Sequence, residues 1–360
     1  MTLGWFAALK KCQKIYLIYR GYLRFGIIAS LLLLYYFCLP EKLIEPPYSA
    51  ALYSDSGQLI SVRIAKDEQW RLTPQKNLPE KFKTALITFE DKRFIYHFGV
   101  DPIALSRAIF NNLFSAKRLS GASTLTMQSI RLMRHNPPRT YWEKLKEMIL
   151  ATRLEWRLSK QEIIALYAAH APFGGNVVGI EAASWRYFGR APRQLSWAES
   201  AMLAVLPNNP SMIHLQKNRD RLKVKRDKLL DKLEMLGHLS KLDLSLAKVE
   251  PIPKYRKHLP RFAPHLLDTL SRFNPKKDDL SSTQFATFLD AKLQKKLSRS
   301  VFEYSEQLKK HGIQHAAALV IDNQTMRLKA YVGNAQYNNQ FQSGYAIQIW
   351  REASAAVVVF

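Results

Sequence analysis

Residues 79–101, PEKFKTALITFEDKRFIYHFGVD, join an amphipathic helical pattern to a pair of adjacent carboxylates. The apolar side chains that share one helix face after Pro79 are Phe82, Ala85, Leu86 and Phe89. Glu90 and Asp91 follow that face directly, and Gly99 ends the pattern. A carboxylate at the edge of an apolar cleft has a raised pKa, which a general base needs. The alternative is an ordinary charged helix end, and the spacing alone favours that alternative.

Residues 121–128, GASTLTMQ, place small and hydroxyl residues before a second helical pattern. Hydroxyl side chains cap helix N-termini, and the backbone N–H groups of such an end can bind an anion. Arg131 lies about one helical turn beyond Gln128 and adds positive charge there. Plain helix capping explains the same residues equally well.

A third pattern is a set of residues spaced three and four positions apart: Lys144, Glu147, Ala151 and Glu155. At about 100° per residue they stay on one helix face, whereas Leu145 and Ile149 lie on another face. Arg139 and Lys146 bring further positive charge close to the carboxylates, as a pyrophosphate site requires. The alternative is an exposed helix face that is stabilised by its own ion pairs.

A region rich in Gly and Ala lies between residues 167 and 189. Its short motifs are residues 171–176 (APFGGN), 179–183 (GIEAA) and 187–189 (YFG). Gly and Ala permit tight turns and a close approach of backbones. The sequence therefore favours a structural role for this region over a catalytic one.

Residues 25–39, FGIIASLLLLYYFCL, form an uncharged apolar run that ends at Pro40. The run is short for a membrane span of about 20 residues, and residues 15–19 supply the missing length. The basic residues that precede the run are Lys10, Lys11, Lys14, Arg20 and Arg24. Because Glu41 is the first acidic residue, the positive-inside rule predicts a cytoplasmic N-terminus. A cleaved signal peptide or a buried core helix is the alternative, but residues 38–41 make a poor cleavage site, so we predict an uncleaved single-pass anchor.

The composition limits the class of protein. Lys and Arg number 54 against 29 Asp and Glu, a formal net charge of +25, which implies an anionic partner such as nucleic acid, anionic lipid or a phosphorylated substrate. An apolar fraction of 47% excludes a wholly disordered chain. Only two cysteines occur, which excludes a disulfide scaffold and a Cys-rich zinc module.

The remaining patterns outline the rest of the chain. Residues 50–64 predict a small hairpin, and helical patterns dominate from residue 79 to about residue 210. The clearest helical segments are residues 141–158, 160–170 and 196–206. Residues 217–257 are basic with Leu at helical spacing, which favours a solvated helix and linker over a contact with anionic lipid. Residues 316–321 and 326–332 predict two strands of an unfinished sheet, and we expect this region to be disordered or aggregation-prone because such a sheet exposes an edge.

Taken in order, these motifs resemble the glycosyltransferase domain of class A penicillin-binding proteins, glycosyltransferase family 51. Residues 90–101 match E-D-x-x-F-x-x-H-x-G-x-D, residues 121–128 match G-[GA]-S-T-L-T-x-Q, and residues 144–155 match K-x-x-E-x-x-x-A-x-x-x-E. Residues 67–71 (DEQWR) and 171–176 resemble the 1C type within that class. The resemblance is specific over roughly residues 48–210 and looser over the rest.

The resemblance implies a mainly α fold. A lysozyme-like glycosyltransferase domain would follow an N-terminal transmembrane helix on the outer, periplasmic face of the bacterial inner membrane, with a small β-hairpin and an incomplete C-terminal α/β transpeptidase portion. It implies polymerisation of lipid II into glycan strands, with inversion at the anomeric carbon and release of undecaprenyl pyrophosphate. The implied partners are lipid II, the growing glycan chain, membrane lipids and other cell-wall synthesis proteins, and nucleic acid is not among them.

The resemblance also implies roles for individual residues. Glu90 is the expected general base, and Glu147 is the expected second carboxylate, which supports the pyrophosphate site or its metal. The positions expected to bind substrate are Asp91, Arg107, Ser123, Thr124, Gln128, Arg131, Arg139, Lys144, Lys146 and Glu155. A divalent cation, Mg²⁺ or Mn²⁺, is the expected cofactor. Residues 110–114 fall where the family has a lobe that dips into the membrane.

The sequence departs from the family in two places. Ala168 and Ala169 stand where the family often has Leu and Asn. The S-x-x-K of residues 245–248 lies in the basic linker, and no K-[ST]-G occurs, so we expect a truncated or frameshifted product without transpeptidase activity. The expected divisions are a cytoplasmic basic tail (1–24), an anchor (25–39), the glycosyltransferase domain (48–215), a basic and Pro-rich linker (216–282) and a truncated transpeptidase beginning (283–360).

Three other functions remain open from the sequence. A lysozyme-like lytic transglycosylase would cleave glycan with one acidic Glu and would not need Glu147. A membrane-anchored scaffold could keep the fold without activity. A basic nucleic-acid binder fits the charge but not the predicted topology, because the anchor places the basic domain outside the cytoplasm.

Overall fold

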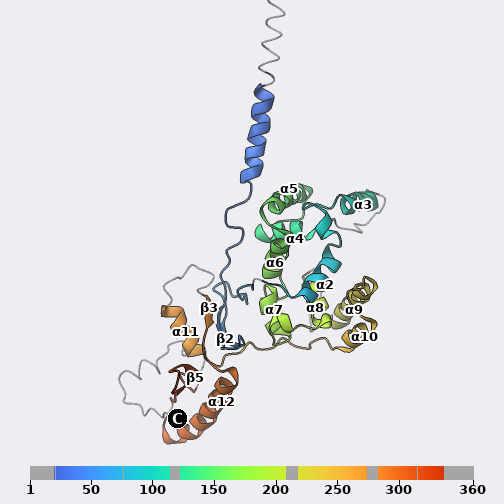
Figure 1. The fold of residues 1–360 in the computed structure, drawn as a ribbon. Helices are drawn as coiled ribbons and strands as arrows, with labels where there is room; N and C mark the ends of the chain where they lie inside the picture. The colour runs from blue at the N-terminus through green and yellow to red at the C-terminus, as the bar shows by residue number, and fades with distance from the viewer. Residues whose placement is uncertain are drawn as a thin grey trace, which may run out of the picture. The chain divides into compact units, whose positions relative to one another are not determined.

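The protein is mainly helical, as predicted, in a computed structural model that describes residues 20, 22–75, 77–113, 122–207, 218–273, 283–313 and 315–335 (Figure 1). The chain divides into two compact units. Unit 1 combines Met1–Glu45 with Arg93–Ile163, and unit 2 combines Pro46–Lys92 with Ile164–Phe360. We describe each unit by itself.

Unit 1 contains a helix at residues 22–37 and three further α-helices, the last two of which carry residues of the second and third motifs. These are α3 Pro102–Leu113, α4 Leu125–Met133 and α5 Tyr141–Arg157, after a short 3₁₀ helix η1 Phe94–Tyr96. α4 packs against α5. Both helices begin at hydroxyl caps, because Thr124 accepts from the Met127 N–H and Thr140 accepts from the Glu143 N–H, each at 3.1 Å.

The predicted anchor coincides with the helix at residues 22–37, whose large apolar side chains are exposed, among them Leu31, Leu34 and Phe37. No helix among the described residues is both long enough and apolar enough to cross a membrane. Residues 1–19 of the predicted basic tail lie outside the described residues.

Unit 2 holds the helix that carries Glu90. α2 Glu80–Glu90 buries Phe82, Ala85 and Leu86, which confirms the predicted apolar face. α2 packs against α8 Trp197–Val205, and α9 Arg219–Met235 packs against both. The other helices are α6 Lys160–His170, which begins in unit 1, α7 Ile180–Tyr187, α10 Lys241–Val249, α11 Pro264–Phe273 and α12 Ala291–Leu308, with short 3₁₀ helices η2 Pro192–Gln194 and η4 Lys309–His311.

The predicted linker begins with packed helices. In α9 the residues Leu222, Leu229, Leu230 and Leu233 are buried, as their helical spacing allows. Arg226 is 1% exposed and donates to the Glu250 carbonyl at 2.7 Å, which ties α9 to the end of α10. The first part of residues 216–282 is therefore helical, as its Leu spacing predicted, with one face buried and the other exposed. Residues 208–217 and 274–282 lie outside the described residues.

The predicted early hairpin is confirmed and gains a third strand. β1 Ala50–Tyr53 pairs antiparallel with β2 Leu59–Arg63. β3 Gln284–Ala286 pairs parallel with β1, so the strand order is β2-β1-β3. Sequence patterns missed β3 because three residues show no alternation. Leu52 and Ile60 pack with Leu267 and Leu289 in the core beside this sheet.

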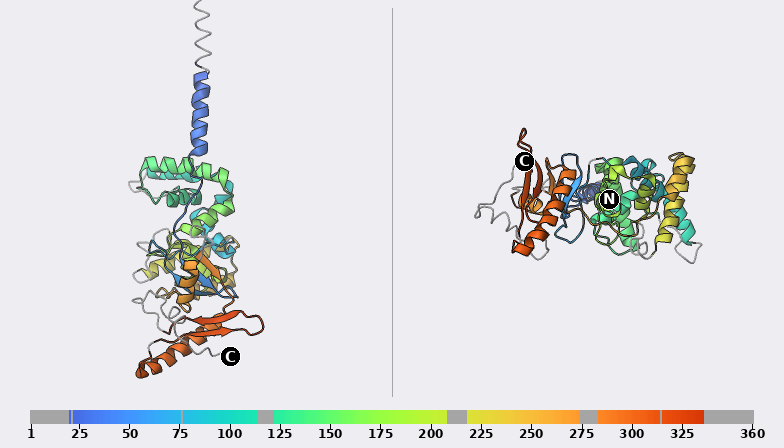
Figure 2. Two further views of the ribbon diagram at one scale, coloured as in Figure 1. Left: turned by 90° about the vertical axis from the view of Figure 1, so that its left-hand side faces the viewer. Right: turned by 90° about the horizontal axis from the view of Figure 1, so that it is seen from below.

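The late hairpin folds, and the expectation of disorder is wrong for its strands. β4 Ala318–Ile321 pairs antiparallel with β5 Leu328–Val332. Figure 2 shows the pair beside α12. The buried side chain of Gln294 on α12 donates to the Tyr331 carbonyl and accepts from the Tyr331 N–H, each at 2.8 Å. The helix thus satisfies backbone groups of β5 that an unfinished sheet would expose. Residues 336–360 lie outside the described residues.

A buried carboxyl group makes the stability of unit 2 depend on pH. Glu181, in the first turn of α7, is 6% exposed, and burial raises its pKa from 4.5 to about 8 against a hydrogen bond from the Gln75 backbone. Between these values the folded state binds more protons than the unfolded state, so stability is lost as pH rises from about 4.5 to about 8. We expect the unfolding temperature to fall over this range and Glu181→Gln to flatten the profile. Glu303→Gln, on the exposed face of α12, should leave the slope unchanged; a parent without the slope contradicts the prediction.

Candidate functional site

α5 buries a charged side chain and exposes large apolar ones. Glu147 and Ala151 are 3% and 0% exposed, whereas Leu145 and Ile149 are 41% and 47% exposed. Surface helices normally bury the apolar face. The alternative of an exposed ion-paired face is therefore wrong for Glu147 and Ala151. The buried face of α5 thus includes a carboxylate beside the apolar residues Ala151 and Leu154, and a buried charge of this kind needs charged or polar partners.

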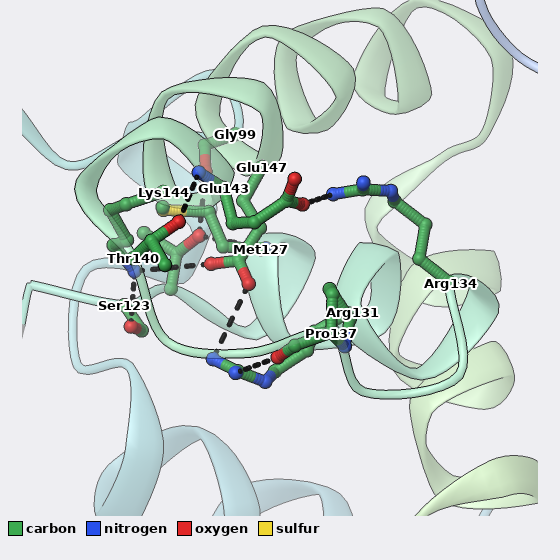
Figure 3. Close-up of polar contacts among 11 residues, drawn as sticks. Gly99, Ser123, Met127, Arg131, Arg134, Pro137, Thr140, Glu143, Lys144 and Glu147 are labelled. Atoms are coloured by element: carbon green, nitrogen blue, oxygen red, sulfur yellow. Dashed lines mark hydrogen bonds and ion pairs between the residues drawn. The ribbon is translucent and has the colours of Figure 1, made fainter.

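Glu147 lies between two cations from different elements of unit 1 (Figure 3). Arg131 Nη1 on α4 is 3.4 Å from Glu147 Oε1, and Lys144 Nζ is 3.5 Å from Oε2. The Lys144 ammonium also donates to the Ser123 hydroxyl. Arg131 is fixed from its other side because its Nη2 donates to the Pro137 carbonyl at 2.7 Å. We call Ser123, Arg131, Lys144 and Glu147 the Glu147 cluster.

Positive charge exceeds negative charge in this cluster. Burial is the main cause that lowers the pKa of Lys144, and Arg131 and Arg139 lower it further, while Glu147 opposes them. Arg139 is exposed. Glu147 thus pairs with two cations, and Arg139 adds a third positive charge that acts on Lys144, so the neighbourhood attracts a further anion.

Lys146 belongs to a separate group on the outer side of α5. Its ammonium is 2.9 Å from Glu143 Oε1 and lies 5.6 Å from the centre of the Trp142 ring. Glu143 also pairs with Arg134 at 2.6 Å (Figure 3). Lys146 therefore does not join the Glu147 cluster in this structure, although its sequence position suggested the same site.

The side chains of two predicted substrate-binding residues, Thr124 and Glu155, form hydrogen bonds or ion pairs within unit 1. The Thr124 hydroxyl donates to the Gly99 carbonyl at 2.6 Å while it caps α4. Glu155 accepts from the Thr126 hydroxyl at 2.6 Å and pairs with Lys160 at 2.8 Å. Both residues hold unit 1 together, and their contact with substrate stays a prediction.

Gly99 makes the approach between the first motif and α5 possible. Its φ is +80°, and a Cβ atom there would lie 2.7 Å from the carbonyl carbon and oxygen of Ala151. Only a glycine tolerates both the conformation and the contact. The close fit sets the Gly99 carbonyl where Thr124 can bond it.

The remaining predicted residues of unit 1 are more exposed. Arg107 is exposed on α3, and Gln128 is half-buried on α4. Asp101 caps α3 by accepting from the Ile103 and Ala104 N–H groups, each at 3.0 Å, and pairs with Arg93. Of the predicted lobe at residues 110–114, residue 114 lies outside the described residues.

Glu90 and Asp91 end α2 in unit 2. Asp91 is 6% exposed and its N–H donates to the Ile87 carbonyl at 3.0 Å. Tyr167 on α6 lies close to Glu90: burial raises the pKa of this phenol, and the charge of Glu90 raises it further. The charge of Glu90 therefore acts on a buried phenol of α6, and its role as general base stays a prediction.

The structure adds Lys232 to the surroundings of Glu90. From α9 its ammonium donates to the Thr88 carbonyl in the last turn of α2. Burial, and then the charge of Lys92, lower the pKa of Lys232 to about 8. Sequence reasoning missed Lys232 because it lies far from Glu90 along the chain and no motif marks it. Tyr167 begins the region rich in Gly and Ala, for which the sequence favoured a structural role.

A metal site is not evident in the described residues. No three His, Cys, Asp or Glu side chains there come close enough together to hold a metal ion. Glu147 faces two cations instead of further acidic ligands. A divalent cation at this site stays a prediction.

Comparisons with known proteins find similarity over the part of the chain that contains these motifs. Residues 56–234 match the family described as transglycosylase. Penicillin-binding protein 1C of Escherichia coli (strain K12) is 36% identical over 270 residues, which cover 75% of this chain and 34% of that protein. Penicillin-binding protein 1A of Clostridium tetani (strain Massachusetts / E88) is 34% identical, with 58% of this chain and 28% of that protein covered. For penicillin-binding protein 1F of Bacillus subtilis (strain 168), the identity is 27% and the coverages are 88% and 45%. The chain thus spans between 28% and 45% of the length of these curated relatives.

Proposed function

We propose that this chain, which belongs to the transglycosylase family through residues 56–234, is a peptidoglycan glycosyltransferase that polymerises lipid II into glycan strands. The Glu147 cluster carries the proposal. It offers an excess of positive charge around a buried carboxylate. That arrangement suits a substrate whose leaving group is a pyrophosphate.

The chemical step needs a base for the acceptor. In the proposed reaction, the Glu90 carboxylate takes the proton from the 4-hydroxyl of the acceptor sugar as that oxygen attacks the anomeric carbon of the donor. The bond from this carbon to the pyrophosphate oxygen breaks, and the pyrophosphate leaves with the electron pair. Attack opposite the leaving group inverts the anomeric centre. Tyr167 is 3% exposed, and the charge of Glu90 acts on its phenol.

The Glu147 cluster would bind the leaving group. Arg131 and Lys144 would neutralise the charge that develops on the pyrophosphate, and the Ser123 hydroxyl would donate to it. Glu147 would hold both cations in position between turnovers, because it contacts each of them. Arg139 would add long-range attraction from the surface. The roles of Arg107, Gln128 and Lys146 in donor binding remain predictions, as does a divalent cation.

We also propose that unit 1 works at the surface of the bacterial inner membrane, with residues 22–37 as part of the anchor. Tyr35 on this helix donates to the Thr152 hydroxyl of α5 at 3.0 Å, and Arg153 donates to the Tyr36 carbonyl at 3.0 Å. The exposed apolar residues of α5 are Tyr141, Trp142, Leu145, Ile149 and Trp156. Such a face lies naturally in the interfacial region of a bilayer.

The direct test is polymer formation from purified lipid II by the detergent-solubilised chain. We expect the parent to form polymer. In Glu147→Gln the rate should fall about a hundredfold, because Arg131 and Lys144 lose the carboxylate that positions them for the leaving group. Glu143→Gln is the matched control, since Glu143 is ion-paired on the same helix but outside the Glu147 cluster; its rate should stay within a few fold. Anhydro-muropeptides from sacculi would favour a lytic transglycosylase, and no product from the folded parent would favour a scaffold.

The apolar face of α5 predicts a second, membrane-dependent effect. With lipid II in vesicles, we expect the double substitution Trp142→Ser and Ile149→Ser to slow polymerisation by about tenfold, because two buried apolar contacts with the bilayer are lost. With lipid II dispersed in detergent, the rate should stay close to that of the parent. Leu246→Ser, at an exposed apolar position on α10, is the control. Equal losses in vesicles and in detergent would argue against membrane contact.

A further inference from the structure

Two segments that the sequence singled out, residues 67–71 and 171–176, meet in unit 2. The Trp70 N–H donates to the Asn176 carbonyl at 2.7 Å, and the Val178 N–H donates to the Trp70 carbonyl at 3.0 Å. Asn176 Nδ2 donates to the Glu68 carbonyl at 3.1 Å. The two segments therefore form one fixed platform, and neither has a role in the proposed reaction.

The platform holds an arginine from α7. The Arg186 guanidinium lies 5.9 Å from the centre of the Trp70 ring, and its Nη1 donates to the Lys257 carbonyl. Its Nε is buried and has no hydrogen-bond partner. A buried N–H without an acceptor is costly, so the hydrogen-bonding capacity of Arg186 is only partly used within the described residues.

A second guanidinium lies beside the first. Arg256 rests against the backbone of Gly174 and Gly175, where φ is +102° and +58°, and a Cβ atom at Gly175 would overlap the guanidinium. Arg256 also hydrogen-bonds to the Tyr187 side chain. The absence of a side chain at Gly174 and Gly175 thus leaves space for the Arg256 guanidinium, in addition to permitting a tight turn.

The two arginines repel each other. Burial, and then the charge of Arg256, lower the pKa of Arg186. Within the described ranges, neither guanidinium forms an ion pair with an acidic side chain, in contrast to Arg190, which pairs with Glu199 at 3.2 Å. Two like charges in one neighbourhood without an acidic partner attract an external anion.

We propose that Arg186 and Arg256 form a subsite that binds a carboxylate of the peptide carried by the glycan. The assignment rests on the proposed function, because it takes its ligand from the same substrate. Planar guanidinium pairs match carboxylates and phosphates alike. The pyrophosphate has cations of its own in the Glu147 cluster and leaves at each transfer, whereas the disaccharide units of the product keep their acidic peptides.

The test is a calorimetric titration of the detergent-solubilised full chain with a soluble N-acetylglucosaminyl-N-acetylmuramyl pentapeptide. We expect binding to the parent, and binding at least about tenfold weaker once the peptide carboxylates are amidated, because charge-assisted hydrogen bonds are lost. The double variant Arg186→Gln and Arg256→Gln should lose the same factor. Arg193→Gln, at an exposed arginine of the same unit, should bind as the parent does.

Each outcome decides the assignment. Equal affinity for the free and amidated peptides overturns it, as does the absence of binding to the folded parent. Competition by inorganic phosphate, with no effect of amidation, would assign the subsite to phosphate instead. The amidation comparison needs no variant, so it holds even where the double variant fails to fold. Carboxylate-dependent binding that persists in Glu90→Gln, together with polymer from lipid II in the parent, separates this subsite from the polymerase reaction.

Discussion

Replacing Glu90 by glutamine should lower the rate of glycan polymerisation by about a thousandfold, because the acceptor hydroxyl then lacks the group that takes its proton. The loss should appear in kcat rather than in KM, since glutamine keeps the size of the side chain. The measurement is the initial rate of polymer formation from lipid II, with the unfolding temperature recorded beside it. We expect that temperature to stay close to that of the parent, because Glu90 ends its helix.

The matched control lies at the other end of the same helix. Glu80 is an exposed first-turn residue of α2 that pairs with Lys83 at 3.1 Å, so Glu80→Gln changes the same chemical group without touching Glu90. Its rate should equal that of the parent. A Glu90→Gln variant that polymerises at a comparable rate would remove Glu90 from the role of general base and leave the scaffold or another carboxylate to be considered.

Gly99→Ala should give the largest loss of stability, about 3 kcal/mol in the free energy of unfolding. Part of the cost is the left-handed conformation at φ +80°. The rest is the steric clash of the new methyl group with the Ala151 backbone, because the backbone of α5 cannot easily move away. We also expect slower polymerisation, because the Gly99 carbonyl anchors Thr124 at the start of α4. Urea unfolding and the lipid II assay measure the two effects.

A second glycine separates the two parts of that cost. Gly237 has a similar φ of +76°, but nothing lies within 4 Å of a Cβ atom placed there. Gly237→Ala should therefore lose only about 1 kcal/mol, the cost of the backbone conformation alone. If both alanine variants lost the same amount, the close approach of Gly99 to α5 would contribute nothing.

Periodicity predicted the helices because most of them bury an ordinary apolar face. The segments predicted at 141–158, 160–170 and 196–206 correspond to α5, α6 and α8. The family predicted from the motifs is confirmed, since residues 56–234 match it. For α5, the spacing placed Glu147, Ala151 and Glu155 on one face, but spacing cannot tell which face points inward. That choice is made by partners such as Arg131, which come from another helix.

The contacts that the sequence could not supply are those between distant segments. Lys232 reaches the end of α2 from a helix that composition marked as a basic linker. Arg256 finds its place against Gly175 through a turn that has no helical or strand pattern of its own. For Lys146, proximity along the chain predicted a place in the Glu147 cluster. In the structure its side chain pairs with Glu143 instead. Such pairings depend on the folded backbone and leave no periodic trace.

The short strand β3 has a consequence for the order of folding during synthesis. It pairs with β1, and the Thr287 hydroxyl donates to the Tyr53 carbonyl across a sequence separation of 234 residues. Contacts of such high contact order form late, because a long loop must close first. On a chain that emerges from its N-terminus, the β1–β2 hairpin must wait with one edge unpaired while the helices after it are made. β1 is paired on both of its sides only when β3 has been made. Until then its free edge can bind a chaperone or a neighbouring nascent chain.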